Sequence, residues 1–243
     1  KLKETKNTNT EINWYFSPEF LLININQNLF SREYSKNQII EDNIGFSPET
    51  GSLLKFLKKK RKNQPVNTLL ITLPCDTLAK SDSDDLSAYG KSLACFFKDI
   101  HHIFKFCLPV HLFMSNVNML TGYNEFTQAF YTKNNKETLG WVNSKPFGHD
   151  IDFSDISDDF NSLIQNIKKL TLSFISTTKT SQYLGHGDNG IAELYVFQWN
   201  FERLAQKFLN VLNTVMEKYK WIHELPPIRG VHFIASSKNL GTI

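Results

Sequence analysis

Short, nearly continuous apolar runs alternate along this chain with longer segments whose apolar residues recur every three or four positions. Runs of the first kind are typical of buried strands, and they occur at Phe20–Ile25, Val66–Leu73, Pro109–Met114 and Val231–Ala235. The helical spacing predicts helices at Leu53–Lys62, Leu86–Phe104, Asn124–Tyr131, Ile156–Leu170 and Phe201–Tyr219. This alternation predicts an α/β fold with a mainly parallel sheet that helices flank on both faces.

Polar segments that contain turn-forming residues separate these elements. We interpret them as loops at Asn26–Ser52, Lys80–Asp85, Lys133–Asp155 and Ser176–Asn189. Asp84 or Asp85 is placed to cap the following helix, because a carboxylate accepts hydrogen bonds from the free amides of the first turn. The 243 residues suffice for one large domain, in which the helical part from about 124 to 225 is a candidate subdomain.

Charge changes this picture little. The formal net charge is +3, whereas nucleic-acid binding needs basic residues gathered on one face or interleaved with aromatic ones. One basic cluster, Lys58–Lys62, closes a predicted helix. It could bind phosphate or an anionic membrane surface, but cations also suit the C-terminal end of a helix, and we favour that interpretation. We therefore expect no nucleic-acid partner.

The remaining candidate chemistry is sparse. Three cysteines with apolar neighbours fit no zinc or redox spacing, and we interpret them as reduced, buried thiols: Cys75, Cys95 and Cys107. His101 and His102 share no helix face with another ligand, and His186 with Asp188 in a glycine-containing loop is a weak metal candidate. No serine or cysteine carries a nucleophile signature.

The sequence predicts neither a membrane-spanning helix nor a signal peptide. No run approaches the roughly 20 apolar residues that a membrane-spanning helix needs, and the polar opening is no signal peptide. The first residue is not Met, so we interpret the chain as a piece of a longer protein.

Several distinctive segments follow one another in a fixed order, and together they cover nearly the whole chain. They are Trp14–Asn24, Leu53–Lys59, Gln64–Leu73, Leu108–Phe126, Glu137–Trp141 and Pro227–Phe233. This ordered set resembles the IcmF/TssM family, whose members are large inner-membrane proteins of type VI and type IVB (Dot/Icm) secretion systems. The resemblance implies a cytoplasmic domain with a GTPase-like fold. It also implies a membrane-anchored parent whose partners include a TssL/DotU-type membrane protein, other secretion-system subunits and baseplate components.

The nucleotide site that such a fold would carry is degenerate in this chain. No glycine-rich phosphate loop with its lysine occurs anywhere in the sequence. Where many family members have an aspartate for the magnesium shell, Asn24 supplies a neutral amide, which is a poorer partner for a divalent cation. Where they have a glycine whose amide approaches phosphate, Gln27 adds a side chain.

The segment that would read the base is altered as well. The family pattern at the end of the third strand is Thr-Lys-x-Asp, and this chain has Ser115, Asn116, Val117 and Asn118. Asn118 would set an NH₂ group against a guanine donor, and an unpaired buried polar group costs about 1–3 kcal/mol. Asparagine is also a common turn residue at strand ends, so these positions could serve the turn alone.

We therefore expect a pseudo-GTPase that acts as a scaffold on the cytoplasmic side of the bacterial inner membrane, with no cofactor. The alternative is a nucleotide-dependent switch that binds ATP or GTP with Mg²⁺ through a phosphate loop preceding Lys1.

Overall fold

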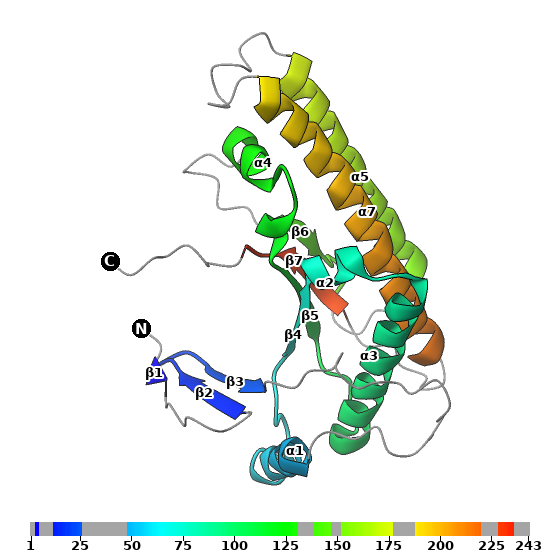
Figure 1. Cartoon of the computed structure of the whole chain (residues 1–243). Helices are drawn as coiled ribbons and strands as arrows, with labels where there is room; N and C mark the ends of the chain where they lie inside the picture. The colour runs from blue at the N-terminus through cyan, green and yellow to red at the C-terminus, as the bar shows by residue number, and fades with distance from the viewer. Residues whose placement is uncertain are drawn as a thin grey trace.

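A four-stranded sheet forms the centre of the molecule (Figure 1). The computed structural model describes residues 3–4, 12–25, 48–130, 139–146, 152–176, 188–219 and 228–235. The strands are β4 (Leu69–Pro74), β5 (Val110–Ser115), β6 (Gly140–Val142) and β7 (Ile228–Phe233), in the order β4-β5-β7-β6. β4, β5 and β7 are parallel and β6 is antiparallel to β7. The mixed α/β architecture with a mainly parallel sheet is thus confirmed.

Three long helices lie on one side of this sheet (Figure 1): α3 (Ser83–Phe104), α5 (Phe153–Ser176) and α7 (Asp188–Tyr219). The shorter helices are α1 (Pro48–Lys60), α2 (Cys75–Lys80), α4 (Tyr123–Phe130) and the 3₁₀ turn η1 (Val117–Met119). α7 contacts α2, α3, α4 and α5, so it is the helix around which the others pack. Its buried residues Leu204, Phe208 and Leu212 share one core with Leu112 and Met114 of β5.

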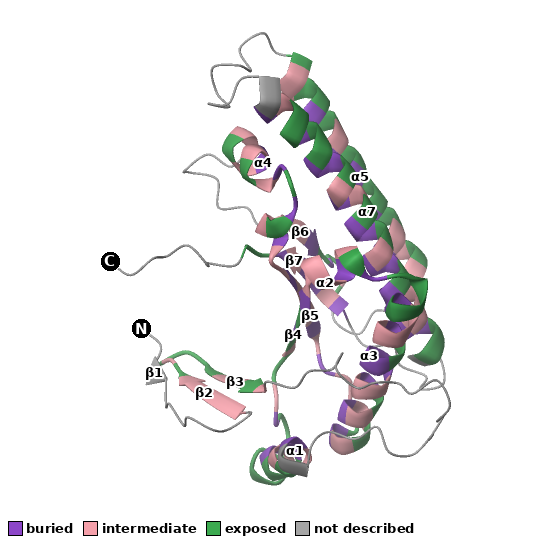
Figure 2. Cartoon of the chain, in the orientation of Figure 1, coloured by how far each residue is buried: buried purple, intermediate pink, exposed green. Residues whose placement is uncertain are grey.

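The opposite face of the sheet is not covered in the same way. Along β5, buried residues alternate with half-buried ones, and Leu70 of β4 and Val142 of β6 are exposed (Figure 2). The predicted covering of both faces is therefore wrong for the ranges that the structure describes. The reason is topological: β4, β5 and β7 follow one another in the same direction across the sheet, and right-handed crossovers then place their helices on one face.

A second, three-stranded sheet precedes this core in the chain. It comprises β1 (Lys3–Glu4), β2 (Ile12–Phe16) and β3 (Leu21–Ile25), all antiparallel. The strand predicted at Phe20–Ile25 thus exists as β3, but its residues are exposed or half-buried, so both its burial and its assignment to the parallel sheet are wrong. The backbone N–H of Ser17 donates to Phe20 O at 2.9 Å and closes a tight turn, and so short a connection allows only antiparallel pairing.

Some helices begin at other residues than the sequence predicts, because local polar contacts determine where they start. The cap of α3 is Asp82, whose carboxylate accepts the amides of Asp84 and Asp85 at 2.9 Å each. Asp85 in turn accepts the Asp82 amide, so the predicted caps lie within the first turn instead. α7 also begins 13 residues before the predicted start at Phe201, and α2 and β6 fall in segments that were not predicted to be regular.

The turn before α4 is held against α7 by a glycine. Gly122 has φ +84°, and a Cβ there would lie 1.9 Å from the Glu193 carbonyl oxygen. No other residue type fits both the left-handed backbone and this close approach. Gly122 therefore fixes where α4 meets α7, at the ring contact between Phe126 and Phe197 with centroids 4.6 Å apart.

Candidate nucleotide site at the carboxyl edge of the sheet

The turn after β5 lies at the carboxyl edge of the parallel strands, where α/β proteins usually bind ligands. Ser115 ends β5, and Asn116 follows in the left-handed conformation at φ 62° and ψ 29°. The N–H of the buried Val117 donates to Ile234 O at 3.2 Å, while the Ile234 N–H donates to Met114 O at 2.9 Å. These bonds tie the turn to the end of β7.

Asn116 also joins this turn to the end of β4. Its Nδ2 donates to Oδ1 of Asp76 at 3.2 Å. Asp76 lies in the first turn of α2, which starts directly after β4 ends at Pro74. Asparagine tolerates the left-handed region better than most residues, so Asn116 acts as a turn residue. Asp76 engages one N–H of this amide, while the second N–H and Oδ1 take no part in the bond.

Asp76 was missed in the sequence, although an acidic residue just past the end of a parallel strand is a usable signal. The structure brings it together with Ser115 and Asn116, and it places Asn118 in the adjoining 3₁₀ turn, half-buried. These residues form a small polar cluster between the ends of β4 and β5.

Asn24 belongs to the three-stranded sheet and not to the sheet that carries this cluster. It is an exposed residue of β3, opposite Asn13 in the antiparallel ladder. Asn24 therefore does not lie on the same sheet as Ser115 and Asn118, as a shared magnesium and nucleotide site would require. Gln27 and His186 lie outside the described residues.

A small half-open cavity lies at the opposite edge of the sheet, at the amino ends of β4 and β5. It is lined by Leu69, Val110 and the end of α3, and it has room for about one water molecule. Nδ1 of His101 lies 3.6 Å from Sγ of Cys107 on its wall. This cavity is too small for a nucleotide.

The other predicted features have structural roles. Nζ of Lys58 donates to the carbonyl oxygen of Ile103 in the last turn of α3, which fits a helix-capping cation. All three cysteines are free thiols, but the prediction that all three are buried is wrong: Cys75 is fully buried, whereas Cys95 and Cys107 are half-buried. Burial raises the pKa of Cys75 to about 12 and, with the nearby carboxylate of Asp99, raises the pKa of Cys95. In the described ranges no three His, Cys, Asp or Glu side chains gather to hold a metal ion.

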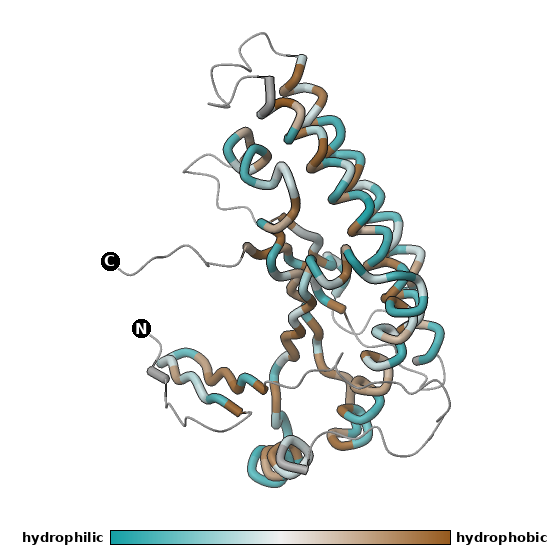
Figure 3. The backbone as a smooth tube through the Cα atoms, viewed as in Figure 1, coloured by the Kyte–Doolittle hydropathy of each residue, from teal (hydrophilic) through white to brown (hydrophobic). Residues whose placement is uncertain are grey.

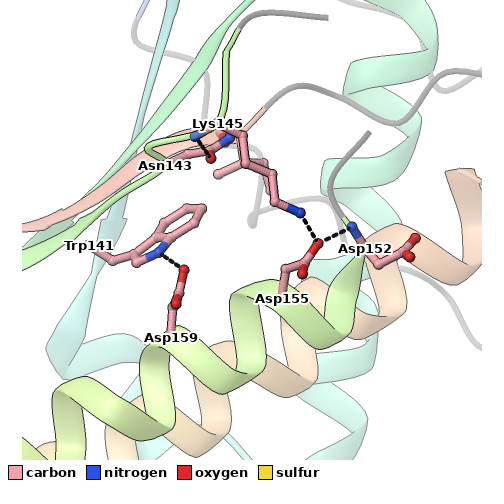
Figure 4. A network of polar contacts seen from close by, with 7 residues as sticks. Trp141, Asn143, Lys145, Asp152, Asp155 and Asp159 are labelled. Atoms are coloured by element: carbon pink, nitrogen blue, oxygen red, sulfur yellow. Dashed lines mark hydrogen bonds and ion pairs between the residues drawn. The ribbon is translucent and has the colours of Figure 1, made fainter. Parts of the chain in front are cut away.

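A polar network fastens β6 to the start of α5 (Figure 4). Nε1 of Trp141 donates to Oδ2 of Asp159 at 2.6 Å, and Nζ of Lys145 donates to Oδ2 of Asp155 at 2.6 Å. That hydrogen bond, a second one from the Asp152 backbone amide, and the Lys145 charge lower the pKa of the Asp155 carboxyl group. The Glu137–Trp141 segment thus ends in a tryptophan that holds this junction together.

The Arg229–Phe233 segment completes the same junction. Nη1 of Arg229 donates to the Lys145 carbonyl oxygen at 2.8 Å. Val231 and Phe233 are buried in the core, while His232 points to the opposite face and bonds to His111. Every side chain of this distinctive segment thus contributes to packing or pairing within the sheet.

These observations define an α/β protein whose central sheet carries a neutral turn, from Ser115 to Asn118, at the edge where α/β proteins usually bind ligands. The family model described as IcmF-related N-terminal domain matches residues 49–242. The chain therefore belongs to the IcmF-related family, which makes it part of a secretion-system component, with other secretion-system subunits as its partners.

No curated protein and no solved structure matches the chain. Among the helices that the structure describes, none is both long enough and apolar enough to cross a bilayer.

Proposed function

We propose that this chain is a scaffolding module that docks partner subunits of a bacterial secretion system from the cytoplasmic side of the inner membrane. Its fold is a degenerate GTPase-like one that does not hydrolyse nucleotide. The observation that carries this proposal is the bond between Asn116 and Asp76. It supports the proposal because Asn116, which stands where the resembling family has a lysine, is a left-handed turn residue whose amide already donates to Asp76.

The residue chemistry at the edge of the sheet supports the same conclusion. Asn116 and Asn118 are neutral where the resembling family has a lysine and an aspartate. Asp76 adds a carboxylate, which repels an anionic ligand. The 243 residues contain no glycine-rich loop with a lysine, which is the usual means of holding the phosphates of a nucleotide.

Family membership supports the docking half of the proposal. A TssL/DotU-type membrane protein is the partner we propose first, because the resembling family pairs with proteins of that type. The four-stranded sheet and its helices share one core, so they offer a firm platform on which subunits can assemble.

Titration calorimetry of the purified chain with GTP, GDP and ATP, each with Mg²⁺, tests the pseudo-enzyme half. We expect no heat of binding up to millimolar nucleotide for the wild type and for the matched variants Asn116→Ala and Asn118→Ala. Micromolar binding that either substitution weakens would refute it. Co-purification of the parent with a TssL/DotU-type protein tests docking separately, and we expect Asn118→Ala to leave it unchanged.

One observation favours a nucleotide-dependent switch as a second candidate. Ser115 and Asn118 do lie at the carboxyl ends of parallel strands, which is the usual ligand edge of an α/β sheet. This candidate requires a phosphate loop in a segment preceding Lys1. Calorimetry on a longer version of the protein that carries such a loop distinguishes the two proposals.

A further inference from the structure

We propose that His111 and His232 form a proton-operated latch between the two central strands of the sheet. The latch is closed while the pair holds at most one extra proton, and it opens when both imidazoles are protonated. This inference is independent of the proposed docking function.

The pair lies on the face of the sheet that α3, α5 and α7 leave uncovered. The strand register places two rows of side chains across this face. They are Leu70, His111, Gly230 and Val142 in the first row, and Thr72, Phe113, His232 and Gly140 in the second. Apart from the two histidines, none of these eight residues titrates or carries a charge.

The two imidazoles meet end to end. Nδ1 of His111 lies 3.2 Å from Nε2 of His232, with the ring planes 18° apart and the centroids separated by 5.4 Å. The centroids are thus separated by the N···N distance plus about one ring radius on each side, so the two nitrogens lie close to the line between them. This is the geometry of an N–H···N hydrogen bond, in which one nitrogen donates and the other accepts.

This hydrogen bond limits how many protons the two imidazole rings can bind together. A neutral pair forms it, and so does a pair with one extra proton, because one bare nitrogen remains to accept. With both rings protonated, two N–H groups and two positive charges would face each other across 3.2 Å. The rings must then separate.

The surroundings oppose the second proton. Partial burial lowers the pKa of both histidines, and the charges of His232 and Arg229 lower the pKa of His111 further. Leu70 and Thr72 of β4, with Gly140 and Val142 of β6, offer no carboxylate to stabilise an imidazolium.

Neighbouring contacts also hold the pair in place. The ring of Phe113 stacks on His232 with centroids 5.1 Å apart. A Cβ on Gly230 would lie 2.8 Å from His232 Nε2 and 3.2 Å from His111 Nδ1. Gly230 therefore leaves the room that the pair needs, and the Phe113 ring restrains the position of His232.

The sign of the pH dependence follows from these lowered pKa values. Imidazoles of the unfolded chain titrate near pH 6.5. Below that pH the unfolded chain therefore binds more protons than the folded pair does. Stability from the closed latch is thus fully present above about pH 6.5 and declines as the pH falls below it. We expect the unfolding equilibrium constant to be roughly tenfold larger at about pH 5.5 than at about pH 7.5.

Urea unfolding at several pH values, for the whole chain, tests the latch. His111→Gln and His232→Gln keep polar groups that cannot take up a proton, so we expect most of the pH dependence between about 7.5 and 5.5 to disappear. His102→Gln, an exposed residue of α3, is the matched control and retains it. Equal pH dependence in all three variants would overturn the proposal.

Histidine NMR on the wild type provides a reading that does not depend on the folding of any variant. We expect the ring signals of His111 and His232 to titrate together, with midpoints below the ordinary histidine value near 6.5. Independent titration of each ring near pH 6.5 would contradict the latch.

Discussion

Single polar side chains connect parts of this fold that the backbone ladders do not reach. Nζ of Lys207 donates to the carbonyl oxygens of Ala79 and Ser81 at 2.7 Å each, which ties α7 to the end of α2. Asn116 similarly links the end of β5 to α2 through Asp76. Each such contact satisfies a helix end or turn that would otherwise depend on water.

Acid should weaken the junction between β6 and α5. The pKa of Asp155 is lowered by its bond to Lys145, so its contribution is present above the unfolded pKa near 4 and is lost as the pH falls through the folded value. We expect Asp155→Asn to be less stable than wild type at neutral pH, with a difference that shrinks below about pH 4. Urea midpoints measured across this range check it.

Asp158, an exposed residue of the same helix, provides the control for this measurement. Asp158→Asn should leave the shape of the acid profile unchanged. A constant difference between wild type and Asp155→Asn down to about pH 2 would show that the ion pair is not the cause.

The buried thiol of Cys75 should be chemically silent in the native protein. Burial, with a smaller effect of Asp76, raises its pKa to about 12, and the thiolate is the reactive form. In a Cys95→Ser/Cys107→Ser variant, we expect Ellman's reagent near pH 8 to react only at the rate at which the protein unfolds. The Cys75→Ser variant, which retains the two half-buried thiols, should react faster. Prompt labelling of Cys75 in folded protein would contradict its burial.

At the scale of elements, the ends of helices depend on residues that lie just outside the periodic apolar pattern. The apolar spacing places α3 correctly, since Leu86, Leu93 and Phe104 are all buried. Its start is decided by Asp82, which precedes the first apolar residue by four positions and closes a capping box with Asp85.

Removing this cap should destabilise the whole protein, because α3 packs along α7. We expect Asp82→Ala to lower the free energy of unfolding by about 1 kcal/mol, within a range of roughly 0.5–2 kcal/mol. Urea unfolding followed by circular dichroism measures this. Asp82→Ser keeps an oxygen that accepts the same amides and should stay close to wild type. Equal losses in both variants would mean that the cap itself contributes nothing.

The sequence predicts elements better than it predicts which elements pair. The long helices are found because their apolar positions recur over many turns (Figure 3), although α7 begins 13 residues before its predicted start. The strands β4, β5 and β7 are found because each is a short apolar run. β3 is a counterexample, since its apolar run looks the same whether it is buried in a parallel sheet or forms one strand of a hairpin. The turn from Ser17 to Phe20 decides the matter, and it lies outside the run.

The candidate site shows the same limit. The sequence places Ser115, Asn116 and Asn118 at the end of a strand, and in the structure Ser115 is the last residue of β5 while Asn116 and Asn118 lie in the turn that follows. It does not reveal that Asp76 meets Asn116, because the two residues are 40 positions apart and the contact depends on β4 lying beside β5. The histidine pair is hidden for the same reason, since 121 positions separate its members.

At the scale of the whole molecule, stability is concentrated in one of the two sheets. The four-stranded sheet with α2, α3, α4, α5 and α7 shares one large core. Among the residues whose burial is described, β2 and β3 supply none of the buried residues of that core. Phe16 and Leu21 on these strands are exposed, as is Phe20 in the turn between them. A sheet with little buried apolar surface opens at a lower free energy than a packed core.

This difference predicts unequal effects for equivalent leucine truncations. Leu112 is completely buried in β5, so Leu112→Ala should lower the free energy of unfolding by about 2–5 kcal/mol. Leu21 is 45% exposed in β3, so Leu21→Ala should change the global value by less than about 0.5 kcal/mol. Urea unfolding gives the global values, and hydrogen exchange should show β2 and β3 opening more readily than β5 in wild type. A comparable loss from both truncations, with equal protection of the two sheets, would mean that they unfold as one unit.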